Sequence, residues 1–124
     1  MNRGSEWHKW DLHFHTPSSY DYDDESVTND DIVNGLLAND VEAVAITDHH
    51  VIDVERISEL QRIAAGRITI LPGIEFLSDA RGREPIHIIG IFPENANLSF
   101  VWEQIKNKTN ILYIFCSWPS PVFC

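Results

Sequence analysis

The sequence has no long apolar run and no basic, apolar start of the secretory kind. Its first residues, MNRGSEWHK, are polar, and its longest late apolar run, Ile111 to Trp118, is too short to cross a bilayer. We therefore expect no membrane segment and a cytoplasmic location. With 124 residues, 44% hydrophobic and 23% charged, the chain is long enough for one domain with a substantial core.

Basic residues and cysteines are also scarce. The 9 Lys and Arg against 19 Asp and Glu leave a net charge of -10, which argues against a basic nucleic-acid-binding surface. A phosphate-bearing substrate is not excluded, because bound divalent cations can reverse the local field. The two cysteines, Cys116 and Cys124, form no disulfide framework and are not spaced like a zinc knuckle.

Strand-like and helix-like patterns alternate along the chain. This alternation predicts βαβ units and a mainly parallel α/β sheet that rolls toward a barrel or an open doubly wound form. Asp53 is a candidate helix N-cap, and Asn39 and Gly66 are candidate helix ends. The expected strands are 10–15, 42–47, 67–71, 74–77 after a break at Pro72–Gly73, 85–92 and 111–116; the expected helices are 30–40, 54–65 and 99–108.

Apolar and polar residues alternate in the first expected strand, WDLHFH. Because side chains alternate between the two faces of a strand, one face is expected to present Asp11, His13 and His15 together. The other face is expected to pack into the core through Trp10, Leu12 and Phe14.

Three further segments place metal-ligating residue types at or near strands. Asp48, His49 and His50 follow the second strand in TDHH, Glu75 lies in PGIEF, and His87 lies in PIHIIGIF. The carboxyl ends of parallel strands converge on one site, so these side chains are expected to meet. His87 fits less cleanly, because it lies near the start of its strand.

Imidazole and carboxylate groups together suit divalent zinc, manganese or iron. Each segment alone has an ordinary explanation: an incidental pair of histidines, a helix cap, a turn residue or a core histidine. The combination at strand ends favours a metal site. Of the remaining histidines, His8 is expected to face solvent and His50 to support a ligand.

The segments DLHFHT, AITDHH, PGIEF and IHIIGIF resemble the successive motifs of the PHP (polymerase and histidinol phosphatase) superfamily, in order, over residues 9–92. The start of the chain, MNRGSEWHKWDLHFHTPSSYDY, resembles TrlF-type proteins, in which an N-terminal PHP domain precedes an AAA-like or SMC-like ATPase. The resemblance implies a distorted (β/α)7 barrel with two to three divalent ions (Mn, Zn or Fe) at its mouth.

The resemblance also implies roles for individual residues. The implied metal ligands are His13, His15, Asp21, His49, Glu75 and His87, and the implied catalytic set is His13, His15, Asp48, His49, Glu75 and His87. Asp21 is the nearest match to an acidic ligand that relatives often carry one position earlier, where this chain has Tyr20.

The chain departs from the family pattern after His87, because no later histidine follows to supply the further ligands. We therefore expect residues 1–108 to form the N-terminal part of a PHP domain and residues 109–124 to be an apolar tail from a truncated or frameshifted end. An ATPase domain is expected downstream in the full-length relative.

Three functions remain open from the sequence. The leading hypothesis is a metal-dependent phosphoesterase that acts on nucleic acid or nucleotides through a metal-activated water. The second is a small-molecule phosphatase of the histidinol-phosphate type. The third is a catalytically inactive, metal-binding scaffold domain.

Overall fold

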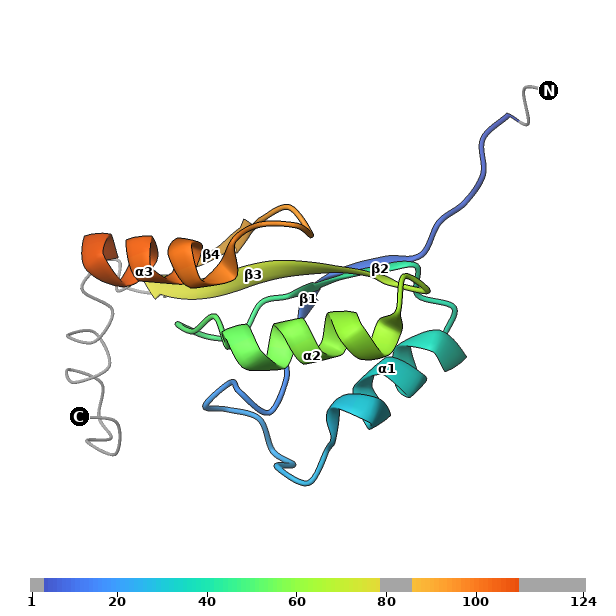
Figure 1. The fold of residues 1–124 in the computed structure, drawn as a ribbon, viewed down its shortest axis with the longest axis horizontal. Helices are drawn as coiled ribbons and strands as arrows, with labels where there is room; N and C mark the ends of the chain where they lie inside the picture. Colours follow the sequence, from blue (N-terminus) through green and yellow to red (C-terminus); the bar gives the residue numbers. More distant parts are fainter. Residues whose placement is uncertain (1–3, 79–85, 110–124) are drawn as a thin grey trace.

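The computed structural model describes residues 4–78 and 86–109. Within this part of the chain, one four-stranded sheet has the order β1-β2-β3-β4, and α1 and α2 lie side by side along one side of it (Figure 1). The elements are β1 (Trp10–Phe14), α1 (Asn29–Ala38), β2 (Ala43–Ile46), α2 (Val54–Ala64), β3 (Thr69–Ser78), β4 (Ile86–Ile91) and α3 (Leu98–Thr109). No helix within the described ranges is both long and apolar enough to pass through a membrane.

The core lies between the sheet and the two helices. Its buried members alternate with polar residues on α1 and α2 at helical spacing, so each helix turns one apolar stripe toward the sheet. The largest contributions come from Val33 and Leu36 of α1, Ile57 and Leu60 of α2, and Val44, Ile46, Ile70 and Ile74 of the strands.

The helix ends follow from local capping. A capping box joins Thr28 and Asp31 at the start of α1, and Asn39 caps its end as predicted. Asp53 caps α2 as predicted, through a bond from the Arg56 N–H. The other end differs slightly from the prediction: Ala65, not Gly66, is the C-cap and adopts a left-handed conformation with φ 49°.

The predicted break at Pro72–Gly73 is wrong, because β3 runs through both residues. Pro72 is the last residue of β3 that pairs with β2, opposite Ile46, and its carbonyl oxygen accepts a bond from Phe92 N at 2.8 Å. Gly73 is the first to pair with β4, opposite Ile91. The strand therefore changes partners at this dipeptide without ending.

The prediction of parallel pairing holds for β1, β2 and β3 but not for β4, which is antiparallel to β3. A parallel return needs a crossover of roughly a dozen residues or more. Only residues 79–85 join β3 to β4, so an antiparallel return is the geometry that this length permits. The sheet is consequently mixed.

The prediction for the faces of β1 is partly wrong. Phe14 packs against the core, whereas Trp10 is 63% and Leu12 41% exposed. A register shift between Asp11 and Phe14 interrupts the alternation of side chains. Asp11 lines a cavity beside α1 together with Phe14, and its Oδ1 accepts from the backbone N of His13 at 3.1 Å.

Some expected features lie outside the described residues. These are the strand at 111–116 and residues 110–124 of the expected tail; Thr109, at the start of that tail, is the last residue of α3.

We predict that Gly73→Ala destabilises the protein by roughly 1–3 kcal/mol, the usual cost of overpacking a tight site. A Cβ atom at Gly73 would lie 2.8 Å from Gly90 O and 3.0 Å from Ile46 O, both of them backbone atoms with little room to move. The measurement is the free energy of unfolding in urea.

Gly35→Ala is the matched control. Gly35 is exposed on α1 with no atom within 4 Å of an added Cβ, so alanine there should raise stability by about 0.5–1 kcal/mol. Equal effects of the two substitutions would contradict the close approach at Gly73.

Candidate metal centre

The predicted metal ligands gather at one edge of the sheet. His13 lies near the end of β1, His15 follows it, His49 follows β2, and Glu75 lies in the second half of β3. Because β4 is antiparallel, its start lies at this same edge, and His87 stands opposite Leu77 of β3. The reversed strand therefore explains why a histidine near a strand start joins residues from strand ends.

Backbone hydrogen bonds hold the TDHH segment against β3 after β2 ends. Thr47 N donates to Phe14 O at 2.8 Å, Glu75 N donates to Asp48 O at 3.1 Å, and His50 N donates to Glu75 O at 2.9 Å. His49 and Glu75 thus face each other across a parallel bridge. The short strand β2 is in this way extended just far enough to bring an imidazole to the Glu75 carboxylate.

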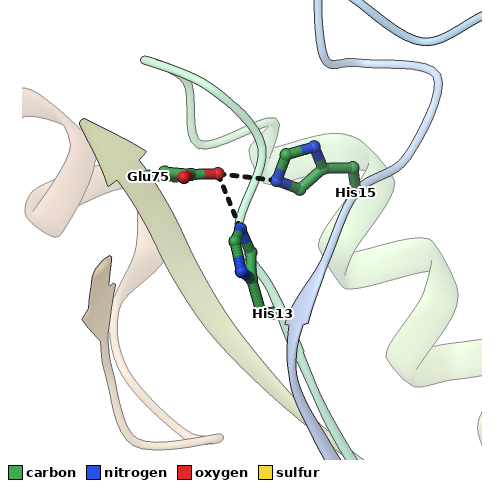
Figure 2. A group of neighbouring side chains, drawn as sticks. All are labelled: His13, His15 and Glu75. Atoms are coloured by element: carbon green, nitrogen blue, oxygen red, sulfur yellow. Dashed lines mark hydrogen bonds and ion pairs between the residues drawn. The ribbon is translucent and has the colours of Figure 1, made fainter. Parts of the chain in front are cut away.

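The Glu75 carboxylate is the hub of the cluster. Its Oε2 accepts from Nε2 of His13 at 2.8 Å and of His15 at 2.7 Å (Figure 2). Its Oε1 accepts from His87 Nδ1 at 2.5 Å. The Glu75 side chain is only 1% exposed, whereas those of His13 and His87 are about half exposed. The carboxylate therefore lies at the bottom of a group of imidazoles that open toward solvent.

The Glu75 carboxyl group remains negatively charged despite its burial. Burial raises its pKa, but the hydrogen bonds from His13, His87 and His15, with the charge of His49, outweigh burial and hold the pKa at about 2. A permanent negative charge behind several imidazoles is an arrangement that attracts a cation.

His49 has a buried nitrogen directed into the cluster. Burial lowers the pKa of His49, although Asp21 and Glu75 partly oppose this, so the neutral ring is favoured. Its Nε2 lies 3.1 Å from Asp21 Oδ2. Its Nδ1 is buried, lies 3.6 Å from Glu75 Oε2 and makes no hydrogen bond within the described part of the chain. A neutral imidazole with such an atom suits a metal ion.

Two overlapping groups have donor atoms close enough to share ions. One is His13, His15 and Glu75, and the other is His15, Asp21 and His49; within each group the donor atoms lie within 4.8 Å of one another. Nitrogen and oxygen ligands bind zinc at about 2.0–2.2 Å, so two ligands of one ion fall within this separation. The residues present therefore fit divalent metal, and the predicted ligand Asp21 lies beside His49.

Asp48 is a predicted site residue that the structure places behind the ligands. Its Oδ1 accepts from Thr16 N at 2.6 Å and its Oδ2 from Thr16 Oγ1 at 2.7 Å. Burial raises the pKa of Asp48 despite these two bonds. Both oxygens are thus used to hold the backbone next to His15, which makes Asp48 a positioning residue rather than one that reaches the cluster.

Two further residues, Ser19 and Tyr20, lie next to His49 and are not among the predicted site residues. Ser19 is buried; its hydroxyl donates to Asp21 Oδ1 at 2.8 Å and accepts from His49 N at 3.1 Å. Tyr20 is 43% exposed, and its ring centroid lies 5.3 Å from that of His49. No sequence signal pointed to either residue, because both depend on how the segment after β1 folds back onto the TDHH segment.

The two histidines outside the predicted ligand set lie in different places. His8 is exposed, as expected, and its Nδ1 lies 2.6 Å from Glu42 Oε2. His50 is buried beside the cluster, with its backbone N donating to Glu75 O at 2.9 Å and its ring 6.3 Å from that of His49.

Comparison with known proteins supports a hydrolase fold. No family model matches the chain, and no curated protein matches it either. Among solved structures, the chain is similar to an amidohydrolase from Chromobacterium violaceum, determined with bound sulfate and no metal, at 28% identity and a TM-score of 0.54. The match covers 80% of this chain and 34% of that one, so the chain spans about a third of the length of its relative.

The fold and the side-chain cluster together define a class. The chain is an α/β half-barrel with a curled mixed sheet that matches part of a barrel amidohydrolase, which confirms the predicted fold class. It has a metal-dependent hydrolase-like fold with His, Glu and Asp groups that are candidates for a metal site.

We predict that Thr16→Val destabilises the protein by about 1–3 kcal/mol, because it removes the hydroxyl donor of a buried carboxylate. Thr16→Ser keeps that donor and should cost clearly less. Urea unfolding of the two variants measures the difference. Equal losses would show that the Thr16 methyl group, not the bond to Asp48, stabilises this turn.

Proposed function

We propose that the chain forms part of a metal-dependent phosphoesterase of the PHP type, acting on phosphoesters of nucleic acid or nucleotides. The observation that carries the proposal is the convergence of histidines from β1 and β4 on the buried carboxylate of Glu75 in β3. The order of the four motifs along the chain supports the PHP assignment over other metal-dependent hydrolases.

The residues have separable tasks. His13, His15 and Glu75 would hold one ion, and Asp21 and His49 would help to hold a second. His15 belongs to both candidate groups, but a neutral imidazole has one free nitrogen and binds one ion at a time. His87 would support the far oxygen of Glu75. When bound, divalent ions supply Lewis acidity and lower the pKa of a coordinated water to about 7. Glu75 balances the added positive charge without a change of protonation, since its pKa is about 2.

The hydroxyl groups of Ser18 and Ser19 are poorly placed as nucleophiles, which favours water. The Ser18 oxygen accepts from Arg56 Nε at 2.6 Å, and the Ser19 oxygen accepts from His49 N at 3.1 Å. Each oxygen would have to give up this bond before it could attack a substrate. Tyr20, half exposed beside His49, is placed to contact a substrate that approaches the open side of the cluster.

The solved structure that resembles this chain bears on the substrate in two ways. It holds sulfate, a tetrahedral oxyanion with the shape of a phosphate group, which is compatible with a phosphoester substrate. Its description as an amidohydrolase makes hydrolysis of an amide the second candidate for this chain.

We predict that the protein binds divalent manganese or zinc and that Glu75→Gln weakens binding by about 10-fold or more, because the neutral amide removes the central negative charge. Isothermal titration and metal analysis after gel filtration measure this. His8→Ala is the control, because His8 pairs with Glu42 outside the cluster, and its binding should equal that of the wild type. A wild-type protein that retains no metal would overturn the proposal.

We further predict that the manganese-loaded protein cleaves bis(p-nitrophenyl) phosphate faster than p-nitrophenyl phosphate, since a diester resembles a nucleic-acid backbone. His15→Ala should abolish both activities, because His15 belongs to both candidate ligand groups. Faster cleavage of the monoester would favour the histidinol-phosphate type, and cleavage of p-nitroacetanilide alone would favour an amidohydrolase. Metal binding without any hydrolysis would favour a scaffold.

A further inference from the structure

An arginine outside the metal cluster holds both ends of the segment that carries Asp21. Arg56, in the first turn of α2, donates from Nε to Ser18 Oγ at 2.6 Å and from Nη1 to Asn29 Oδ1 at 2.7 Å. Ser18 and Asn29 flank residues 19–28 immediately on either side. One guanidinium group therefore bridges the entry and the exit of this segment.

The N-cap of α2 completes this clamp. Asp53 Oδ2 accepts from Ser18 Oγ at 2.7 Å and lies 3.7 Å from Arg56 Nε, while Asp53 Oδ1 caps the helix through Arg56 N. The Arg56 side chain is 24% exposed. Arg56 is thus a partly buried cation whose position is set by the same residue that starts its helix.

The clamped segment is strongly acidic and lies against the metal cluster. Residues 19–28 contain four carboxylates and no basic residue: Asp21, Asp23, Asp24 and Glu25. Like charges so closely spaced repel one another and favour an open conformation. The segment nevertheless places Asp21 Oδ2 3.1 Å from His49 Nε2, and Ser19 Oγ accepts from His49 N.

We infer that Arg56 is a positioning residue that holds segment 19–28 closed over the cluster and so sets the affinity of the His15–Asp21–His49 group for a divalent cation. The inference on affinity rests on the proposed function, because it requires that this group bind an ion. The inference that Arg56 closes the segment rests on the hydrogen bonds alone.

Arginine is suited to this task and lysine is not. The planar guanidinium donates in two fixed directions, here to Ser18 and Asn29 at the same time. A lysine ammonium keeps the positive charge but lacks the fork that spans both acceptors. Arg56→Lys therefore removes the bridge between Ser18 and Asn29 but keeps the positive charge, so it shows whether the bridge or the charge holds the segment.

The first test needs no metal. We expect hydrogen–deuterium exchange of the amides of residues 19–28 to be at least about 10-fold faster in metal-free Arg56→Lys than in the wild type. The matched control is Arg62→Lys on the same helix, where the guanidinium is exposed and pairs with Glu59; it should leave the exchange unchanged. Unchanged exchange in Arg56→Lys would overturn the clamp.

The second test is a manganese titration by calorimetry. In Arg56→Lys we expect the dissociation constant of the more tightly bound manganese ion to stay within about twofold of the wild-type value. The dissociation constant of the second ion should rise by about 10-fold, which is the lower end of the range for residues that orient ligands. When Asp21 is already replaced by Asn, adding Arg56→Lys should not reduce the manganese affinity any further. The role of Arg56 in affinity would be overturned if Arg56→Lys weakened the binding of both ions equally. It would also be overturned if Arg56→Lys reduced the affinity further in the Asp21→Asn variant.

The outcomes distinguish this inference from the proposed function. If the wild type binds no manganese, the proposed function and the role in affinity both fail, while the exchange experiment still decides the clamp. If Arg56→Lys does not fold, Asn29→Ala removes one arm only and should produce smaller changes of the same kind. No change in exchange or affinity in Asn29→Ala would then overturn the inference.

Discussion

The structure depends on a buried negative charge that accepts hydrogen bonds from several imidazoles. An ionised carboxylate in a protein interior is costly unless it is paired and hydrogen bonded. Glu75 meets this requirement through His13, His15 and His87, which come from both ends of the described chain. Any rearrangement that separates β1 or β4 from β3 would leave this charge uncompensated, so the cluster and the sheet support each other.

The path of β3 makes that meeting possible. At Pro72 and Gly73 the strand leaves the parallel pairing with β2 and begins the antiparallel pairing with β4. The backbones approach so closely at Gly73 that a Cβ atom would lie 2.8 Å from Gly90 O. Glu75 follows two residues later in β3, and its side chain lies at the edge of the sheet where β4 begins and β1 ends. The change of pairing partner at Pro72 and Gly73 therefore places the Glu75 carboxylate within reach of the histidines of both strands.

The polar residues behind the cluster divide into two sets with distinct tasks. Asp48 holds Thr16 and thereby the backbone next to His15. Arg56 and Asp53 hold the ends of the acidic segment that brings Asp21 to His49. Neither set contacts the Glu75 carboxylate by a hydrogen bond within the described ranges, yet each fixes a side chain that lies beside a candidate ligand. Such positioning matters in metal sites, where the direction of each donor decides whether an ion is held.

The sequence by itself determined which elements form and which residue types are available to a metal. The helix caps at Asn39 and Asp53 and the apolar stripes of α1 and α2 are local signals, which is why α1, α2 and their boundaries could be predicted to within one or two residues. Only the tertiary structure decided that β4 runs antiparallel, that a register shift interrupts β1 between Asp11 and Phe14, and that Asp48 supports rather than joins the cluster. These outcomes depend on contacts between residues more than thirty positions apart or on the length of a connection, and a pattern of neighbouring residues carries no information about either.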